Sequence, residues 1–447
     1  MTHSTSRRFF LKKAAFASAA LAVGPAILRS ASPNSKPTFA FVGTGGMGGG
    51  QMGEFGNMGV NCVCYCDADS GHWGDAAKRW PNAKGYQDYR EMFDKHAKEF
   101  DAVTVGTPDH NHYPASILAL MAKKHCYTQK PLTHTVWEAR QLALAAKKYG
   151  VATQMGNQGH AGEGWRLVYE WIKSGALGDI KEVHSWTNRP IWPQGMATPA
   201  GEDPVPASLN WDAWIGPAPM RPFKKDVYHP FKWRGFWDFG AGALGDMACH
   251  TMDGLFWALD PGHPISVECT EASEPTGDVY PKKSIIKWEY AARNGRPAFA
   301  SFWYDGGNKP PRPAELEADR NLPETGNLFI GTKATIMIQG DYGDSPRIIP
   351  EAKMKEIGKP PRMLERSPGH YREFYMAVAG EKPIDFPKSN FSYAGPMSES
   401  IILGNVALKA GVGKKLMWDG PNLQVTNMPE MNKYVNKEYR NGWDFHM

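Results

Sequence analysis

The sequence has few cysteines, no strong excess of charge and no long apolar run beyond its first residues. Six of the 447 residues are cysteine and none has the paired spacing of zinc ligands, which excludes a zinc-ribbon or disulfide-framework protein. The formal net charge of +5 is small for this length, and no basic stripe indicates nucleic-acid binding. Apolar runs that could cross a bilayer, about 18 residues, are absent after residue 30, so we expect no stable membrane anchor. The length suits two domains.

Three of the cysteines, Cys62, Cys64 and Cys66, alternate along one expected strand and would point to the same face. Neighbours on that face would lie about 6.5–7 Å apart at their Cα atoms, near the upper limit for a disulfide. We therefore expect buried, free thiols.

The clearest motif is a short apolar run that breaks into Gly43-x-Gly45-x-x-Gly48. This pattern is typical of a buried strand that turns tightly into a helix whose N-terminus holds a pyrophosphate. Asp67 follows a second apolar run, 19 residues after the last glycine, close to the expected distance for a carboxylate that binds the adenosine ribose. An acid there favours NAD over NADP because it would repel a 2′-phosphate, and Asp69 could share or take that role. The cofactor-binding residues expected in the loop are Gly43, Gly45, Gly46, Met47 and Gly48.

Strands and helices alternate over residues 38–155, which predicts a doubly wound parallel sheet with right-handed crossovers. After residue 155 strands dominate, and many alternate apolar with polar residues as in an antiparallel sheet. We expect an α/β chain with an N-terminal Rossmann domain and a C-terminal α+β domain. The expected boundaries are a signal peptide at 1–35, an NAD(P)-binding domain at 36–155, a substrate-binding domain at 156–425 and a tail at 426–447.

Individual helices can also be predicted from the sequence. Helices are expected over Gln51–Gly59 and Ile117–Lys124. Two late helices, Tyr371–Ala379 and Ser398–Gly411, are expected to pack on the second sheet. The tail after residue 426 is polar and aromatic, and its pattern predicts no definite structure.

The first residues include Ser6-Arg7-Arg8-Phe9-Phe10-Leu11-Lys12, followed by a modestly apolar segment. This pattern predicts a twin-arginine signal, with an ordinary secretory signal behind a basic tail as the alternative. The twin-arginine route carries folded proteins, which suits an enzyme that loads a cofactor before export. We expect a periplasmic or otherwise exported protein that uses the twin-arginine translocation machinery.

The strand expected at Ala102–Gly106 ends in Thr107-Pro108-Asp109-His110-Asn111-His112. Ligands of doubly wound sheets bind at this end of the strands. We therefore expect Thr107, Pro108, His110 and His112 at or close to the cofactor. No carboxylate or cysteine cluster accompanies the histidines, so no metal site is predicted.

A glycine-rich loop then enters a helix that carries Asp246 and His250, four residues apart and on one face. Oxidation of an alcohol by NAD needs a base that takes the hydroxyl proton as hydride leaves, and His250 suits this near neutral pH. Asp246 could orient the substrate or raise the basicity of the imidazole. The alternative is a helical acid beside a buried structural histidine.

The chain resembles the Gfo/Idh/MocA oxidoreductases, named after glucose–fructose oxidoreductase and inositol dehydrogenase, over about residues 38–420. The resemblance rests on the glycine motif, Thr107–His112, Gln129-Lys130-Pro131 and Asp246-x-x-x-His250. It implies that Lys130 contacts the reacting hydroxyl near the nicotinamide, and that a large, mostly antiparallel open sheet covers that ring. The family usually has glutamate where this chain has Gln129, so one charge beside Lys130 is missing while Lys130, Asp246 and His250 are kept. Gln129 and Lys130 are both expected at the cofactor.

The second domain is rich in tryptophan, whose flat faces suit sugar rings, although we expect four or more of these seven in the core or an oligomer interface. Arg189, Arg234 and Asp238 could bind hydroxyls. The tryptophans are Trp186, Trp192, Trp211, Trp214, Trp233, Trp237 and Trp257. The substrate candidates are His160, Arg189, Tyr228, His229, Arg234 and Trp237.

Together these patterns predict an NAD-dependent oxidoreductase acting on a sugar, sugar derivative or polyol. His250 would be the acid/base, Lys130 would polarise the hydroxyl and Asp246 would orient. Since an exported enzyme meets little free NAD, we expect a tightly bound cofactor that is recycled in the site. The alternatives are an NAD-dependent glycosidase or lyase that oxidises its sugar transiently, and a non-catalytic sugar- or dinucleotide-binding protein. The resemblance also implies a homo-oligomer.

Overall fold

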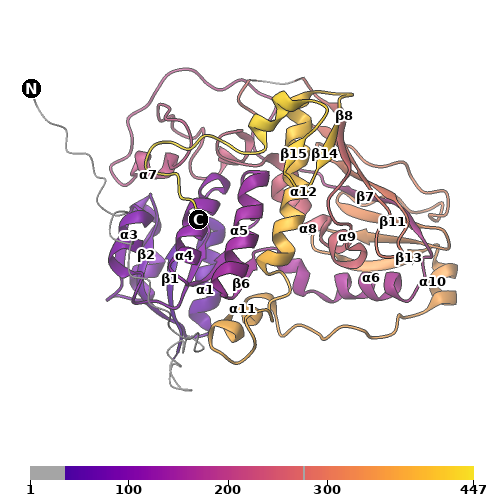
Figure 1. Cartoon of the computed structure of the whole chain (residues 1–447), viewed down its shortest axis with the longest axis horizontal. Helices are drawn as coiled ribbons and strands as arrows, with labels where there is room; N and C mark the ends of the chain where they lie inside the picture. The colour runs from indigo at the N-terminus through magenta and orange to yellow at the C-terminus, as the bar shows by residue number, and fades with distance from the viewer. Residues whose placement is uncertain (1–35, 275–276) are drawn as a thin grey trace, which may run out of the picture. The chain divides into compact units, whose positions relative to one another are not determined.

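Two sheets organise the protein, and the computed structural model describes residues 36–274 and 277–447 (Figure 1). The expected signal peptide at 1–35 lies outside the described residues. Among the described residues, no helix has the length and apolar character that crossing a bilayer requires.

The first sheet has six strands in the order β3-β2-β1-β4-β5-β6, and every neighbouring pair is parallel. The order reverses between β1 and β4, and ligands of doubly wound sheets bind at such a reversal. The predicted parallel sheet is confirmed. Its strands are β1 (Thr38–Val42), β2 (Asn61–Cys66), β3 (Lys84–Tyr86), β4 (Ala102–Val105), β5 (His125–Thr128) and β6 (Thr153–Met155).

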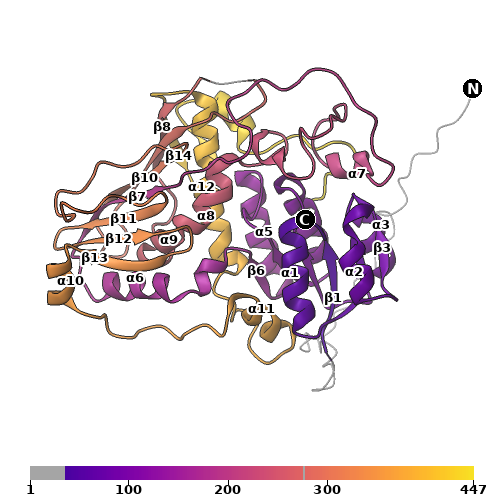
Figure 2. The same cartoon turned by 180° about the vertical axis from the view of Figure 1, so that it is seen from behind.

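Helices cover both faces of this sheet, and two of them begin earlier than predicted (Figure 2). The first begins at Gly46 rather than Gln51, because the glycines of the motif form its first turn. The fourth begins at His112 rather than Ile117, since Pro114 is tolerated in a first turn, where the backbone N–H has no helical partner. The helices are α1 (Gly46–Asn57), α2 (Gly74–Arg79), α3 (Tyr89–His96), α4 (His112–Met121) and α5 (Val136–Tyr149).

The second sheet has nine strands in the order β13-β12-β11-β7-β10-β9-β8-β14-β15. Only the pair β7–β10 is parallel, so the predicted mostly antiparallel sheet is confirmed. Its strands are β7 (Ile180–Trp186), β8 (Ser266–Ala272), β9 (Ser284–Tyr290), β10 (Phe299–Tyr304), β11 (Gly326–Gly331), β12 (Thr335–Gln339), β13 (Asp344–Ile349), β14 (Lys415–Asp419) and β15 (Gln424–Val425).

Helices lie against one face of the second sheet, which explains the alternating burial along β9. Those that contact its strands include α6, α8, α10 and α12. The helices of this part of the chain are α6 (Glu163–Lys173), α7 (Trp211–Ile215), α8 (Gly242–Thr251), α9 (Asp253–Leu259), α10 (Glu351–Ile357), α11 (His370–Val378) and α12 (Phe391–Ala410). Short 3₁₀ turns are η1 (Ser70–His72), η2 (Asp109–Asn111), η3 (Gln158–Ala161), η4 (Lys232–Gly235) and η5 (Pro429–Tyr434).

The two late helices do not both pack as predicted. Helix α11 packs on α1 of the first domain, where Phe374 meets Phe39 and Phe55 with ring centroids 6.1 and 5.8 Å apart. Helix α12 contacts both α5 and β8 and so joins the two domains. It begins at Phe391, capped by the side chain of Asn390, and it contains Pro396, which hid its first turns in the sequence.

Another correction concerns the cysteines of β2. The register against β1 shifts, so that Phe39 lies opposite Cys62 while the next residue, Ala40, lies opposite Cys64. This bulge sends Cys62 to the side of Phe39, whereas Cys64 and Cys66 pack in the other cluster. All six cysteines are free, as predicted, and Cys62 is the one that is only partly buried.

The C-terminal tail crosses back to the first domain and ends beside α4 (Figure 1). The Trp443 side chain is 1% exposed, and the guanidinium of Arg90 lies 3.7 Å from its ring centroid. The Tyr113 hydroxyl of α4 donates a hydrogen bond to the Phe445 carbonyl at 3.0 Å. The tail therefore completes the first domain, although its sequence predicted no definite structure.

Candidate active site

A cavity of about 540 Å³ lies at the carboxyl edge of the first sheet. The first domain supplies one side through the glycine loop, the loop after β4 and the segment after β5. The second domain supplies the other side through α7 and the residues before and in η4. Of the predicted site residues, those that line the cavity are Gly43, Gly45, Gly46, Met47, Asp67, Thr107, Pro108, Gln129, Lys130, His229 and Arg234.

The glycine loop is built for close approach. Gly43 has φ +84°, and a Cβ there would lie 2.6 Å from the carbonyl group of Gly106. A Cβ on Gly48, just behind the cavity wall, would lie 2.3 Å from the Gly43 carbonyl oxygen. No side chain caps the start of α1, so its first N–H groups are left for an anion. These features fit the pyrophosphate of a dinucleotide.

Asp67 is held against this loop. Its Oδ2 accepts hydrogen bonds from the backbone N–H groups of Thr44 (2.9 Å) and Gly45 (3.2 Å), and its Oδ1 accepts from the Asp69 N–H (3.0 Å). Asp69 turns toward the second domain, where it accepts from His229 Nε2 at 2.9 Å. Asp67 is thus the acid at the cavity wall, and its contact with the adenosine ribose stays a prediction.

Lys130 follows β5 and reaches across to α8. Its Nζ donates to Asp246 Oδ1 at 2.8 Å and to the Asp246 carbonyl at 3.1 Å. Arg234 Nε donates to the same Oδ1 at 3.2 Å, so two cations hold one carboxylate. An ammonium group has three N–H bonds. Within residues 36–274 and 277–447 only two acceptors face this one, and Lys130 lines the cavity.

The charges of this cluster are stable near neutral pH. Burial favours the neutral form of Lys130, but the Asp246 carboxylate outweighs burial and the pKa of Lys130 is raised. Burial also favours neutral Asp246, yet Lys130 and Arg234 outweigh it and lower the pKa of Asp246 to about 2. Lys130 is therefore a hydrogen-bond donor and a source of positive charge, and it is not a base.

His250 lies one turn after Asp246 on α8 and is 3% exposed. Burial, reinforced by the charge of Lys130, lowers the pKa of His250 to about 3. Its Nδ1 has no hydrogen-bond partner among the described residues, and its ring meets the Tyr342 ring at 4.8 Å. His250 is thus a neutral imidazole with an unused nitrogen. It is not among the residues that line the cavity.

His110 and His112 are not among the residues that line the cavity, and their place at or close to the cofactor stays a prediction. His110 Nδ1 donates to the Phe239 carbonyl at 3.1 Å. Its Nε2 accepts at 3.1 Å from the Asn111 side-chain amide, which also donates to the Trp214 carbonyl. The His112 ring lies between the carbonyls of Thr107 (2.8 Å) and Pro131 (2.7 Å). Both are buried side chains that hold the loops behind the cavity.

Four of the substrate candidates lie away from the cavity. His160 is buried and bonds Asp253 at 2.9 Å. Tyr228 packs beside Trp211 and Phe236 in a separate cluster of buried, mostly aromatic side chains. The other two are each engaged elsewhere: Trp237 packs on Tyr280, and Arg189 pairs with Asp341.

Other cavity residues were missed. Gln87 follows β3, which has three residues and so too short a pattern to detect. Asp109 lies in a motif that the sequence did single out, and its Oδ2 accepts from the Ala241 N–H at 2.9 Å. Burial and the nearby Asp246 carboxylate raise the pKa of Asp109 to about 7. The other missed lining residues include His72, Tyr89, Asn111 and Phe231.

The tryptophans divide largely as predicted. Five of the seven are at most 9% exposed, which agrees with four or more in the core. Trp214 and Trp233 are among these five, and each also shows part of its surface to the cavity. Their faces, with that of Phe231, make the second-domain side of the cavity aromatic.

Two family models match the chain. "Oxidoreductase family, NAD-binding Rossmann fold" matches residues 38–157, and "Oxidoreductase family, C-terminal alpha/beta domain" matches residues 179–295. Both belong to the Gfo/Idh/MocA group, and together they cover more than half of the chain.

Among curated relatives, inositol 2-dehydrogenase of Salmonella typhimurium is 27% identical over 147 residues, 32% of this chain and 43% of its own length. Levoglucosan dehydrogenase of Pseudarthrobacter phenanthrenivorans is 25% identical over 179 residues, 40% of this chain and 37% of its own length. The matches thus span less than half of these relatives.

Solved structures share the fold across both domains. WlbA dehydrogenase of Chromobacterium violaceum, in complex with NADH and UDP-GlcNAcA, has a TM-score of 0.59 at 19% identity, covering 86% of this chain and 96% of that one. A levoglucosan dehydrogenase with NADH and levoglucosan has a TM-score of 0.55 at 18% identity, covering 86% and 99%. At these identities the likeness shows the fold alone.

Proposed function

Because this chain belongs to the Gfo/Idh/MocA oxidoreductase family, with its NAD-binding Rossmann domain, we propose that it is an NAD-dependent enzyme that oxidises a CH–OH group of a sugar, sugar derivative or polyol. The names of two relatives, inositol 2-dehydrogenase and levoglucosan dehydrogenase, support this substrate class. The observation that carries the proposal is the third N–H bond of Lys130, which has no acceptor among the described residues at the cavity wall.

NAD, when bound, supplies the acceptor for the hydride. Lys130 donates its remaining N–H to the substrate oxygen and stabilises the negative charge that grows there as the proton leaves. Asp246 holds the ammonium group in place, and Arg234 holds Asp246 from the other side. His250 is neutral and has an unused Nδ1, and we propose that it accepts the hydroxyl proton. This role requires the negative charge that grows on the substrate oxygen to raise a pKa that is about 3 in its absence.

A redox-neutral reaction is the second candidate. One relative, 2,7-anhydro-N-acetylneuraminate hydratase of Escherichia coli, is 29% identical over 97 residues, 21% of this chain and 26% of its own length. Its name denotes addition of water without net oxidation. By the same logic this chain would oxidise a glycoside transiently, eliminate its aglycone and return the hydride.

We also propose that the protein is exported by the twin-arginine route and keeps its cofactor between turnovers. The arginine pair at Arg7–Arg8 supports export. Retention follows from compartment, because a released dinucleotide would be lost outside the cytoplasm. A fusion of residues 1–35 to a folded reporter tests export, with Arg7→Lys plus Arg8→Lys as the matched control. Export that is unchanged in this double variant contradicts the route.

The central experiment identifies the nucleotide and its redox balance. The protein is purified, denatured, and the released nucleotide is identified; we expect NAD(H). Sugars and polyols are then screened for NADH formation, and glycosides for release of the aglycone without net NADH. Absence of any nucleotide, together with no calorimetric binding of NAD(H) or NADP(H), overturns the enzymatic proposal.

A further inference from the structure

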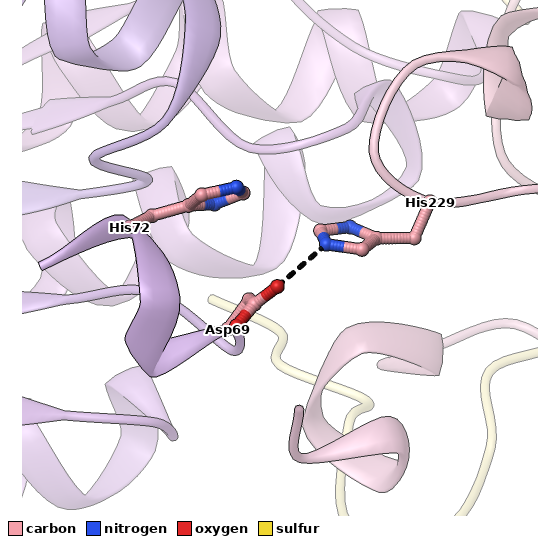
Figure 3. Close-up of side chains that lie close together, drawn as sticks. All are labelled: Asp69, His72 and His229. Atoms are coloured by element: carbon pink, nitrogen blue, oxygen red, sulfur yellow. Dashed lines mark hydrogen bonds and ion pairs between the residues drawn. The ribbon is translucent and has the colours of Figure 1, made fainter. Parts of the chain in front are cut away.

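Asp69, His72 and His229 converge beside the cavity, as Figure 3 shows. Asp69 and His72 belong to the loop after β2, and His229 comes from the second domain. One ligand atom from each of the three lies within 4.8 Å of the other two. Both histidines line the cavity. The three side chains are 14–30% exposed, so an ion could reach them from solvent.

The surrounding structure fixes the loop that carries Asp69. Its Oδ1 accepts from the Gly71 N–H at 2.9 Å, which leaves Oδ2 directed at His229 Nε2, 2.9 Å away. The next residue is tied to the second domain, because the Ser70 N–H donates to the Ser208 carbonyl at 2.9 Å. The carboxylate is therefore held in place by backbone contacts on both sides.

His72 is also held from behind. Its carbonyl accepts from Thr44 Oγ1 at 3.0 Å, and its Nδ1 lies 3.3 Å from Asp67 Oδ1. The ring packs directly over Gly45, where a Cβ would lie 2.5 Å from Nδ1. The centroids of the His72 and His229 rings are 5.4 Å apart, and Figure 3 shows both rings turned toward the space above Asp69.

We propose that Asp69, His72 and His229 bind a divalent transition-metal ion of the zinc class. Two imidazole nitrogens and one carboxylate oxygen are ligands that Zn²⁺ takes at about 2.0–2.2 Å, and three protein ligands leave one tetrahedral position open. Binding requires the side chains to rotate, because the ligand atoms, all within 4.8 Å of one another, must come closer together around the ion. The sequence predicts no metal here, because the ligands come from segments that only the folded chain brings together.

Bound metal would join the two sides of the cavity. Asp69 and His72 lie on the first domain. His229 lies on the second domain and begins the run of residues that lines the opposite side of the cavity as far as Arg234. The ion would restrain the separation of these sides and slow the release of a bound dinucleotide. This consequence rests on the proposed NAD-dependent function, whereas metal binding itself does not.

The test uses the whole protein, stripped of metal with a chelator and titrated with Co²⁺, whose visible absorption reports its ligands. We expect one equivalent of Co²⁺ that Zn²⁺ displaces. His72→Gln and His229→Gln are expected to raise the dissociation constant at least about tenfold, since even the loss of groups behind the ligands costs that much. His96→Gln is the matched control: it also removes a histidine paired with a carboxylate, Glu99, and should bind as the original protein does.

Absence of stoichiometric Co²⁺ or Zn²⁺ binding overturns the site, and so does equal binding by His229→Gln and the original protein. In either case the Asp69–His229 contact is an ordinary hydrogen bond between domains. If the protein binds NAD without binding metal, the proposed function stands and the metal site falls. If it binds metal but no nucleotide, the reverse holds.

A second measurement tests the restraint. We expect Zn²⁺ to slow the release of bound NAD(H) by about fivefold or more, the lower range of coupling between two sites. The His229→Gln protein should release it at one rate with or without Zn²⁺. A release rate of the original protein that Zn²⁺ does not change overturns the restraint.

Discussion

Two lysines in this protein, Lys130 and Lys437, each pair with a buried carboxylate but differ in how many bonds they make. Lys437 Nζ has three acceptors: Glu138 Oε1 at 2.9 Å, His134 Nδ1 at 3.1 Å and the His110 carbonyl at 3.3 Å. Lys130 Nζ has two, both on one aspartate. The first ammonium is fully used by the fold, whereas the second keeps a donor for the cavity.

The carboxylates differ in the same way. Glu138 accepts from Lys437, from the Tyr439 hydroxyl at 2.7 Å and from the backbone N–H groups of His134 and Thr135. It closes the capping box of α5 and is fully buried. Asp246 instead joins two cations that both line the cavity. A buried charge is thus structural when all its partners belong to the fold, and available for chemistry when one bond is left over.

The largest effect is expected for Lys130→Met. Removing the ammonium takes away the donor to the substrate oxygen, and kcat should fall by about 10²–10⁴-fold. Steady-state kinetics on the identified substrate measures this, and calorimetry should find NAD binding largely retained. A kcat within a few-fold of the original protein contradicts the role of Lys130.

Lys437→Met is the structural counterpart. It leaves Glu138 buried without its cation, and the free energy of unfolding should fall by about 3–5 kcal/mol. The folded variant should keep a kcat close to that of the original protein. Urea unfolding measures the first quantity; a stability unchanged by the substitution would show that the tail pairing contributes nothing.

The buried histidines beside both lysines should make the free energy of unfolding depend on pH. Burial lowers the pKa of His110 and His250 to about 3 and that of His134 well below its usual value, with the nearby lysines adding to the effect. The unfolded chain takes up these protons near pH 6.5 while the folded chain does not, so stability is full above pH 6.5 and falls toward about pH 3. Each histidine should cost about 1.4 kcal/mol per pH unit in this window. Unfolding midpoints that stay constant or rise from pH 6.5 to 5.5 would contradict this.

The smallest effect is expected for Tyr439→Phe. This change removes one hydrogen bond to Glu138 and should lower the free energy of unfolding by about 1.5–3 kcal/mol without affecting kcat. The measurement is the same urea titration. A loss as large as that of Lys437→Met would mean that the hydroxyl and the ammonium are equally important to the buried carboxylate.

The sequence singled out Lys130 as a site residue, but it did not predict the contacts of Lys437. The glycine motif, Lys130 and Asp246-x-x-x-His250 lie in short patterns, and local patterns also revealed both sheets. Lys437 and Trp443 lie in a tail without periodicity, and their partners are on the first domain, far away in the chain. Nothing local in the tail indicates such contacts.

The same limit explains where the structure places other candidate residues. Tyr228 and Trp237 read as candidates for sugar contact, but Tyr228 packs in a small aromatic core and Trp237 packs on Tyr280. His110 and His112 are predicted at or close to the cofactor; their rings contact backbone carbonyls of other segments, which their local sequence does not reveal. The bulge that moved Cys62 to the other face comes from pairing with β1, which alternation along one strand cannot reveal.

Because the last residues pack on the first domain, that domain cannot be separated cleanly from the rest of the chain. A fragment that stopped after β6 would lack both α11 and Trp443, and Phe39, Phe55 and Tyr89 would lose apolar partners. Such a fragment should aggregate rather than serve as an isolated nucleotide-binding module. Recombination that exchanges only the front half of this gene would therefore join mismatched surfaces, and a viable chimera needs the final codons from the same parent.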